Sequence, residues 1–130
     1  MESNSTSEQK KTILVADDDE KFALMIASAL EQAGFKTIRA IDGELAVQKI
    51  KADLPDFVLL DIMMPKKIGF EVLEEIKGYE TTKNIPVFTF SHLSQPSDIE
   101  KSRRLGSLGH IVKTDFSIRE LVEKIQSKLR

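Results

Sequence analysis

Apolar residues along the chain fall into two alternating patterns. Short runs rich in β-branched and aromatic residues predict buried strands, because they are too short for helices and end at polar residues. These runs cover residues 12–16, 57–60, 87–90 and 111–112, and a more polar member covers residues 36–40. Between the runs, apolar residues recur at three- and four-residue spacing, which predicts amphipathic helices.

The predicted helices are bounded by residues that start or end helices. Their apolar periodicity covers residues 22–30, 45–50, 70–76, 97–105 and 117–129. The first four end near Gly34, Pro55, Gly78 and Gly106. The fifth begins at Ser117, which forms a capping-box pattern with Glu120. Five strands alternating with five helices predict a doubly wound parallel sheet covered on both faces.

This alternation runs without a linker or repeat from residue 11 to residue 130, so we expect one domain there. Residues 1–10 are polar and can bury almost nothing, which predicts a flexible N-terminal tail or residues left from cloning. This segment also lacks the apolar core of a secretory signal.

Composition narrows the possible functions by exclusion. The net charge of −2 excludes the strongly basic surface of a stand-alone nucleic-acid binder. The absence of cysteine excludes disulfides and thiolate metal sites. No apolar run approaches the roughly 18 residues that span a bilayer. We therefore expect a cytoplasmic protein.

Polar residues that follow the predicted strands carry the candidate chemistry, because open α/β sheets bind ligands beyond the carboxyl ends of their strands. These residues are Asp17, Asp18, Asp19, Asp61, Ser91 and Lys113. Clustered carboxylates suit a hard ion such as Mg²⁺, and one carboxylate can serve as a nucleophile for a phosphoryl group. An ammonium and a hydroxyl can neutralise the phosphoryl oxygens. The pattern thus favours phosphoryl chemistry.

Each of these residues also has an ordinary structural interpretation. Asp19 is better explained as the cap of the first helix than as a metal ligand. Taken alone, Ser91 would be a turn residue and Lys113 a surface lysine. The triplet at residues 17–19 also fits the Asp-x-Asp motif of haloacid-dehalogenase-type phosphatases, an enzyme alternative that leaves Asp61 without a role.

Four segments in register resemble the response-regulator receiver domain of two-component signalling. They read ILVADD (13–18), PDFVLLDIMMP (55–65), IPVFTFS (85–91) and IVK (111–113). The resemblance covers nearly the whole chain from about residue 11. It implies a flavodoxin-like fold with five parallel strands in the order 2-1-3-4-5 and five helices. It also implies a signalling domain, not an enzyme with a separate substrate.

The resemblance assigns roles to the matching residues. Asp61 would be the phosphoacceptor of a sensor histidine kinase or a histidine phosphotransfer protein. Asp18, Asp61 and the Met63 carbonyl would bind Mg²⁺ directly, and Asp17 would contribute through water. Ser91 and Lys113 would hold the phosphoryl oxygens.

The face of the fourth helix, fifth strand and fifth helix would signal to a downstream protein whose identity is unknown. Lys101, Arg104 and Leu108 would lie near that face. No direct contact with nucleic acid or membrane is expected. A receiver that only binds partners, without phosphorylation, is a further alternative, and the complete set of site residues argues against it.

The sequence departs from the family at several positions. His110 stands where a switching Tyr or Phe is common, and the bulky His92 is expected to crowd the space His110 would enter. Thr114 replaces a proline that usually forms a cis peptide, and Ile68 replaces a common Asp. Met63 and Leu93 flank the expected position of attacking water with apolar side chains, which predicts slow autodephosphorylation.

Overall fold

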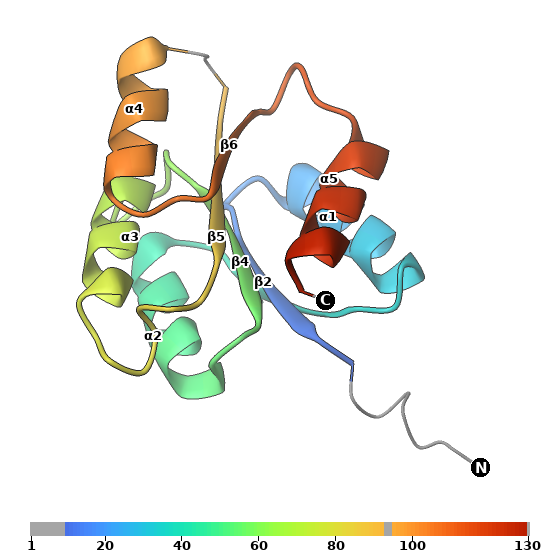
Figure 1. The fold of residues 1–130 in the computed structure, drawn as a ribbon, viewed down its shortest axis with the longest axis horizontal. Coiled ribbons are helices and arrows are strands. Elements are labelled where there is room, and N and C mark those ends of the chain that lie inside the picture. The colour runs from blue at the N-terminus through green and yellow to red at the C-terminus, as the bar shows by residue number, and fades with distance from the viewer. Residues whose placement is uncertain (1–9, 93–94, 130) are drawn as a thin grey trace.

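A computed structural model describes residues 10–92 and 95–129 of the chain. Within these ranges, strands and helices alternate as the sequence predicts (Figure 1). The elements are β2 (Thr12–Ala16), α1 (Glu20–Gln32), β3 (Lys36–Ala40), α2 (Gly43–Asp53), β4 (Phe57–Asp61), α3 (Gly69–Lys77), β5 (Val87–Ser91), α4 (Pro96–Arg104), β6 (Gly109–Val112) and α5 (Ile118–Lys128). Residues 1–9 of the tail predicted at residues 1–10 lie outside the described residues, and so does Leu93.

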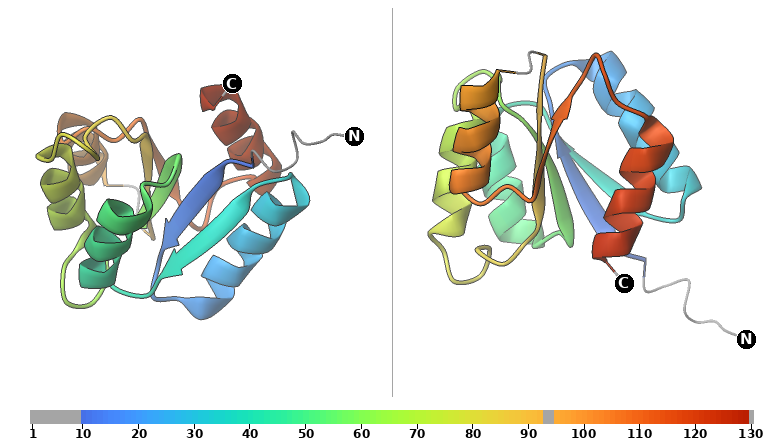
Figure 2. Two further views of the ribbon diagram at one scale, coloured as in Figure 1. Left: turned by 90° about the horizontal axis from the view of Figure 1, so that it is seen from below. Right: turned by 45° about the horizontal axis from the view of Figure 1, so that its top comes forward.

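The five strands form one parallel sheet in the order β3-β2-β4-β5-β6. In chain order this is 2-1-3-4-5, which confirms the predicted flavodoxin-like fold. Helices α1 and α5 cover one face of the sheet, and α2, α3 and α4 cover the other (Figure 2). From β2 the chain adds β3 on one side of the sheet and then β4, β5 and β6 on the other side. The order of strand addition therefore reverses between the neighbouring strands β2 and β4, which is where such folds bind ligands.

Two apolar clusters, one on each face of the sheet, hold these layers together. Along β4, Val58 and Leu60 face the cluster under α2 and α3, whereas Phe57 and Leu59 face the cluster under α1 and α5. All four of these side chains are fully buried. A strand with apolar residues on both faces is typical of a parallel sheet covered by helices, and this explains why β4 reads as a continuous apolar run.

The predicted helix boundaries agree with the structure to within a few residues. Asp19 is the N-cap of α1, and its side chain accepts a hydrogen bond from the Phe22 N–H at 3.2 Å. Gly34, just beyond α1, has φ of +101°. Ser117 caps α5 by accepting a hydrogen bond from the Glu120 N–H at 3.2 Å, which is the serine half of the expected capping box. These caps fix where the chain enters and leaves each helix.

Some strands extend further than the sequence predicts. Asp61 and Ser91 are the last residues of β4 and β5, not the first residues after them, and β6 begins at Gly109. Among the described residues no peptide bond is cis, which agrees with Thr114 in the place of the usual proline. No helix in the described part of the chain is long and apolar enough to cross a membrane.

Candidate functional site

Three carboxylates meet at the carboxyl ends of the two central strands. Asp17 and Asp18 follow β2, and Asp61 ends β4. Because Ala16 pairs with Leu60 in the parallel register, the residues that follow them lie side by side. Ligand oxygens of the three aspartates lie within 4.8 Å of one another. Asp17 is only 1% exposed and Asp61 only 3%, so two of the carboxylates are removed from solvent.

Lys113 brings a buried positive charge to this cluster. It follows β6, and its backbone N–H donates to the Ser91 carbonyl at 2.7 Å. Its Nζ lies 2.7 Å from Asp17 Oδ2 and 3.4 Å from Asp61 Oδ2. The Asp17 contact is an ion pair without the alignment of a hydrogen bond. The ammonium also lies 4.5 Å from the centre of the Phe22 ring, which adds a cation–π contact.

The single positive charge of Lys113 does not neutralise the negative charges of the two buried carboxylates and of the exposed Asp18 carboxylate beside them. Burial and, to a lesser extent, the neighbouring Asp17 carboxylate raise the pKa of Asp61 to about 7, against the opposing effects of Lys113 and the Met63 backbone. Asp61 Oδ1 is a buried oxygen without a hydrogen-bond partner in the described part of the chain. The ionised site therefore lacks positive charge on the Asp61 Oδ1 side.

These observations fit a divalent cation held by oxygen ligands. The donors are carboxylate oxygens only, which is the set that Mg²⁺ prefers. The loop that carries Asp17 and Asp18 is already ordered, because the Asp19 N–H donates to Asp17 Oδ1 at 2.9 Å. Met63 is 67% exposed, so packing of its side chain does not fix its position.

Ser91 lies at the end of β5, buried and next to the cluster in the sheet order. Its Oγ is 2.8 Å from His110 Nε2, and the other ring nitrogen, Nδ1, is 2.8 Å from Thr89 Oγ1. The expectation that His92 crowds His110 is wrong, because His92 is exposed while His110 lies against Ser91. Sequence reasoning missed the role of Thr89, although its position two residues before Ser91 places both hydroxyls on one face of β5.

The loop after Asp61 is held by close backbone approaches. The Gly69 N–H donates to the Ile62 carbonyl at 2.7 Å, and a Cβ at Gly69 would lie 2.4 Å from the Asp61 carbonyl oxygen. A Cβ at Gly43 would lie 1.8 Å from the Lys67 carbonyl oxygen. The start of α2 and the loop at residues 62–69 therefore pack backbone against backbone.

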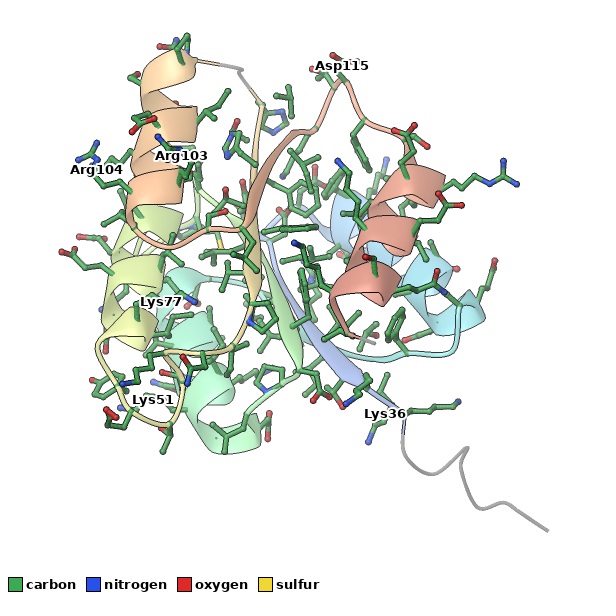
Figure 3. The ribbon with its side chains drawn as sticks, in the orientation of Figure 1. Lys36, Lys51, Lys77, Arg103, Arg104 and Asp115 are labelled. Carbon is green, nitrogen blue, oxygen red and sulfur yellow. The ribbon has the colours of Figure 1, made fainter. Side chains whose placement is uncertain are left out.

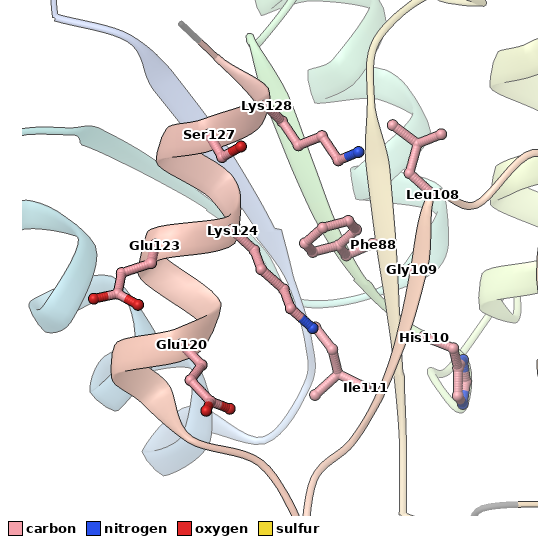
Figure 4. A pocket seen from close by; sticks show the side chains of 10 residues that line it. All are labelled: Phe88, Leu108, Gly109, His110, Ile111, Glu120, Glu123, Lys124, Ser127 and Lys128. Atoms are coloured by element: carbon pink, nitrogen blue, oxygen red, sulfur yellow. The ribbon is translucent and has the colours of Figure 1, made fainter.

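The predicted signalling face is separate from this cluster. Arg103 and Arg104 lie on α4, where Figure 3 labels them, and Lys101, Arg104 and Leu108 are exposed. A groove runs between β6 and α5 (Figure 4). It is lined in part by Leu108, Ile111, Glu120, Lys124 and Lys128, and by none of the six predicted site residues.

Comparison with known proteins places this geometry in a family. The model of the response regulator receiver domain family matches residues 13–126. A probable transcriptional regulator, ycf27, of Porphyridium aerugineum is 37% identical over 122 residues, which are 94% of this chain and 49% of that protein. The phosphate regulon transcriptional regulatory protein PhoB of Pseudomonas aeruginosa is 35% identical over 120 residues, 92% of this chain and 52% of that protein.

Solved structures agree with this assignment. A putative response regulator from Chloroflexus aurantiacus superposes with a TM-score of 0.86 at 28% identity, covering 92% of this chain and 98% of that one. The receiver domain of a Francisella response regulator gives a TM-score of 0.83 at 31% identity, covering 91% and 95% of the two chains. The chain spans about half the length of the curated relatives it matches. On the family match, the sheet order and these similarities, the chain belongs to the response regulator receiver domain family of two-component signalling.

Proposed function

We propose that Asp61 accepts a phosphoryl group from a phosphohistidine of a sensor histidine kinase or a histidine phosphotransfer protein. Accepting a phosphoryl group is the general function of the family. The observation that supports Asp61 as the acceptor is its pair of oxygens: Oδ2 lies 3.4 Å from Lys113 Nζ, and the buried Oδ1 lacks a hydrogen-bond partner among the described residues. An oxygen of Asp61 forms a bond to phosphorus while the P–N bond breaks. The electron pair of the P–N bond stays on the imidazole nitrogen. Because the other ring nitrogen carries a proton, the imidazole is released as a neutral ring.

The residues around Asp61 divide the remaining work. Asp17, Asp18, Asp61 and the Met63 carbonyl would hold Mg²⁺, which would supply positive charge to the phosphoryl oxygens. Lys113 donates to the same oxygens once Asp61 carries the phosphoryl group, because its Nζ already lies 3.4 Å from Asp61 Oδ2. Ser91 contributes a hydroxyl from the neighbouring strand. Because the chain belongs to the receiver family, the phosphatase alternative is not retained.

Incubation with acetyl phosphate and Mg²⁺ tests the acceptor directly. We expect mass spectrometry to show a mass increase of one phosphoryl group, located on the peptide that contains Asp61. The increase is expected to disappear in Asp61→Asn and to remain in Asp19→Asn, whose carboxylate caps α1 and does not belong to the acidic cluster. An adduct on another residue, or no adduct with Mg²⁺ present, would overturn the proposal.

We propose slow loss of the phosphoryl group, because Met63 and Leu93 offer no hydrogen bond to an attacking water. The double change Met63→Asn and Leu93→Glu is expected to speed dephosphorylation about tenfold, the effect of roughly one oriented hydrogen bond on a barrier. The measurement is the decay of the phosphorylated protein after removal of acetyl phosphate. Met25→Asn, an exposed methionine on α1, serves as the control; an unchanged decay in the double variant would contradict the idea.

The output is proposed to pass through α4, β6 and α5 to a downstream protein, in the cytoplasm. Exposed Lys101 and Arg104 make the α4 part of this face basic. The curated relatives are transcriptional regulators about twice as long as this chain. With a net charge of −2, the segment described here is proposed to act on proteins and not to contact nucleic acid or membrane itself.

A further inference from the structure

Asp18 is the member of the acidic cluster whose position is not fixed by packing. Its side chain is exposed, whereas those of Asp17 and Asp61 are buried. An exposed side chain takes its place from the backbone that carries it. The peptide groups before and after Asp18, which join it to Asp17 and Asp19, therefore determine whether its carboxylate stays beside the other two.

A side chain holds each of these two peptides. The Asp19 N–H, in the second peptide, donates to Asp17 Oδ1 at 2.9 Å. The Asp17 carbonyl, in the first peptide, accepts a hydrogen bond from Arg39 Nη2 at 3.2 Å. No backbone N–H in the described part of the chain donates to this carbonyl. Arg39 therefore supplies the hydrogen bond that fixes the first peptide.

Strand pairing brings Arg39 to this position. β3 pairs in parallel with β2, and Arg39 lies opposite Val15. The two chains stay together past the end of β2, because the Asp17 N–H donates to the Ala40 carbonyl at 3.0 Å. The long side chain of Arg39 thus starts beside β2 and reaches the carbonyl of the loop that follows it.

The Asp17 carbonyl is the only hydrogen-bond partner of the Arg39 guanidinium within the described residues. No carboxylate in the same part of the chain forms an ion pair with Arg39. Its Nε is buried and has no partner there. Burying a donor in this way costs free energy, and the hydrogen bond from Nη2 offsets part of that cost. The contact with the Asp17 carbonyl is thus the one that explains where the guanidinium lies.

We propose that Arg39 is a positioning residue for the metal site: by holding the Asp17 carbonyl, it keeps the Asp18 carboxylate beside Asp17 and Asp61, where Mg²⁺ would bind. This inference rests on the proposed function, in which these carboxylates hold Mg²⁺.

Arg39 also carries a positive charge, and its two effects on Mg²⁺ binding have opposite signs. Loss of the hydrogen bond would weaken binding, because Asp18 would be less well placed. Loss of the charge would strengthen binding, because the charge repels a cation. Arg39 is half-buried, so solvent and salt screen its charge, and we expect the positioning effect to be larger.

Calorimetric titration of the unphosphorylated full chain with Mg²⁺ measures which effect is larger. Arg39→Met keeps an unbranched apolar side chain but loses the donor and the charge. We expect its dissociation constant for Mg²⁺ to rise about fivefold, the effect of losing roughly one hydrogen bond. Arg39→Lys keeps a charged donor and is expected to stay within about twofold of the wild type, because a single bond to a carbonyl does not need the planar guanidinium fork.

Lys21→Met is the matched control for the charge. Lys21 is exposed on the first turn of α1, which follows the same loop, so this change removes a positive charge near the cluster and leaves the Asp17 carbonyl in place. We expect its dissociation constant to be unchanged or lower. An unchanged or lower value in Arg39→Met, or an equal rise in both variants, would overturn the inference. Absence of Mg²⁺ binding by the wild type would overturn the proposed metal site and this inference with it.

Amide hydrogen exchange of the metal-free protein separates positioning from a general loss of stability. In Arg39→Met the Asp19 N–H is expected to exchange about fivefold faster, because the loop that contains it loses one of its two side-chain contacts. Amides of α3, on the opposite face of the sheet, are expected to keep their wild-type rates. An equal acceleration in α3 would show a merely structural role and would contradict the positioning of Asp18.

Discussion

Asp61→Asn is expected to raise the free energy of unfolding by on the order of 2 to 4 kcal/mol at pH 8 in metal-free buffer, and by much less at pH 4. The pKa of Asp61 is about 7 in the fold and 3.8 as its unperturbed value. Stability associated with the protonated carboxyl is therefore complete below about pH 4 and is lost as the pH rises through 7. Asparagine carries no charge and avoids this loss.

Urea unfolding of both proteins between pH 4 and pH 8 measures the effect. The difference between Asp61→Asn and wild type should grow across this range and level off above pH 7. Asp18→Asn removes the exposed carboxylate of the same cluster and should change stability much less. Added Mg²⁺ should stabilise the wild type more than Asp61→Asn. A difference that stays constant with pH would contradict the account of the buried charge.

Gly43→Ala is expected to lower the free energy of unfolding by about 3 kcal/mol, as overpacking against a rigid partner does. The added Cβ would lie 1.8 Å from the Lys67 carbonyl oxygen, and backbone cannot rotate away as a flexible side chain can. The Gly43 N–H also donates to the Pro65 carbonyl at 3.2 Å, so separating the two segments loses that contact. Lys66 already has φ of +72°, which leaves this loop little freedom to adjust.

Gly78→Ala is the matched control for that change. Gly78 ends α3 with φ of −88°, and the nearest atom to an added Cβ is 3.3 Å away. We expect a change within about 1 kcal/mol in either direction. Denaturant unfolding of the two variants at pH 7 compares them directly. Equal stability of the Gly43 and Gly78 variants would show that the loop after Asp61 is not held by the approach of α2.

The sequence was sufficient to predict the fold and to predict which charged residues lie together at one edge of the sheet, because both follow from the strands and their ends. Apolar runs identified the strands, and the rule that ligands bind at their carboxyl ends selected Asp17, Asp61 and Lys113. The structure places these three within ion-pair contact. The cap at Asp19 was equally readable, because Asp at the start of an apolar periodic segment is a local signal.

Features that depend on the register of strand pairing, or on close contact between two backbone segments, could not be predicted from the sequence in this way. The contact between His110 and Thr89 requires the pairing of β5 with β6, and nothing local in the sequence states that alignment. His92 appeared to crowd His110 because adjacent positions in sequence were compared without knowing which side chain faces solvent. The need for glycine at position 43 comes from a loop more than twenty residues away, so its reason is visible only in the fold.

The separation of the acidic cluster from the outer faces of the helices has a consequence for evolution within this family. Asp17, Asp61 and Lys113 are buried at strand ends, whereas Lys101 and Arg104 are exposed on α4. Under the proposed function, drift in the exposed residues can change which protein is recognised while the buried charges stay fixed. Duplicated copies of such a gene can therefore diverge into insulated pathways that share one reaction.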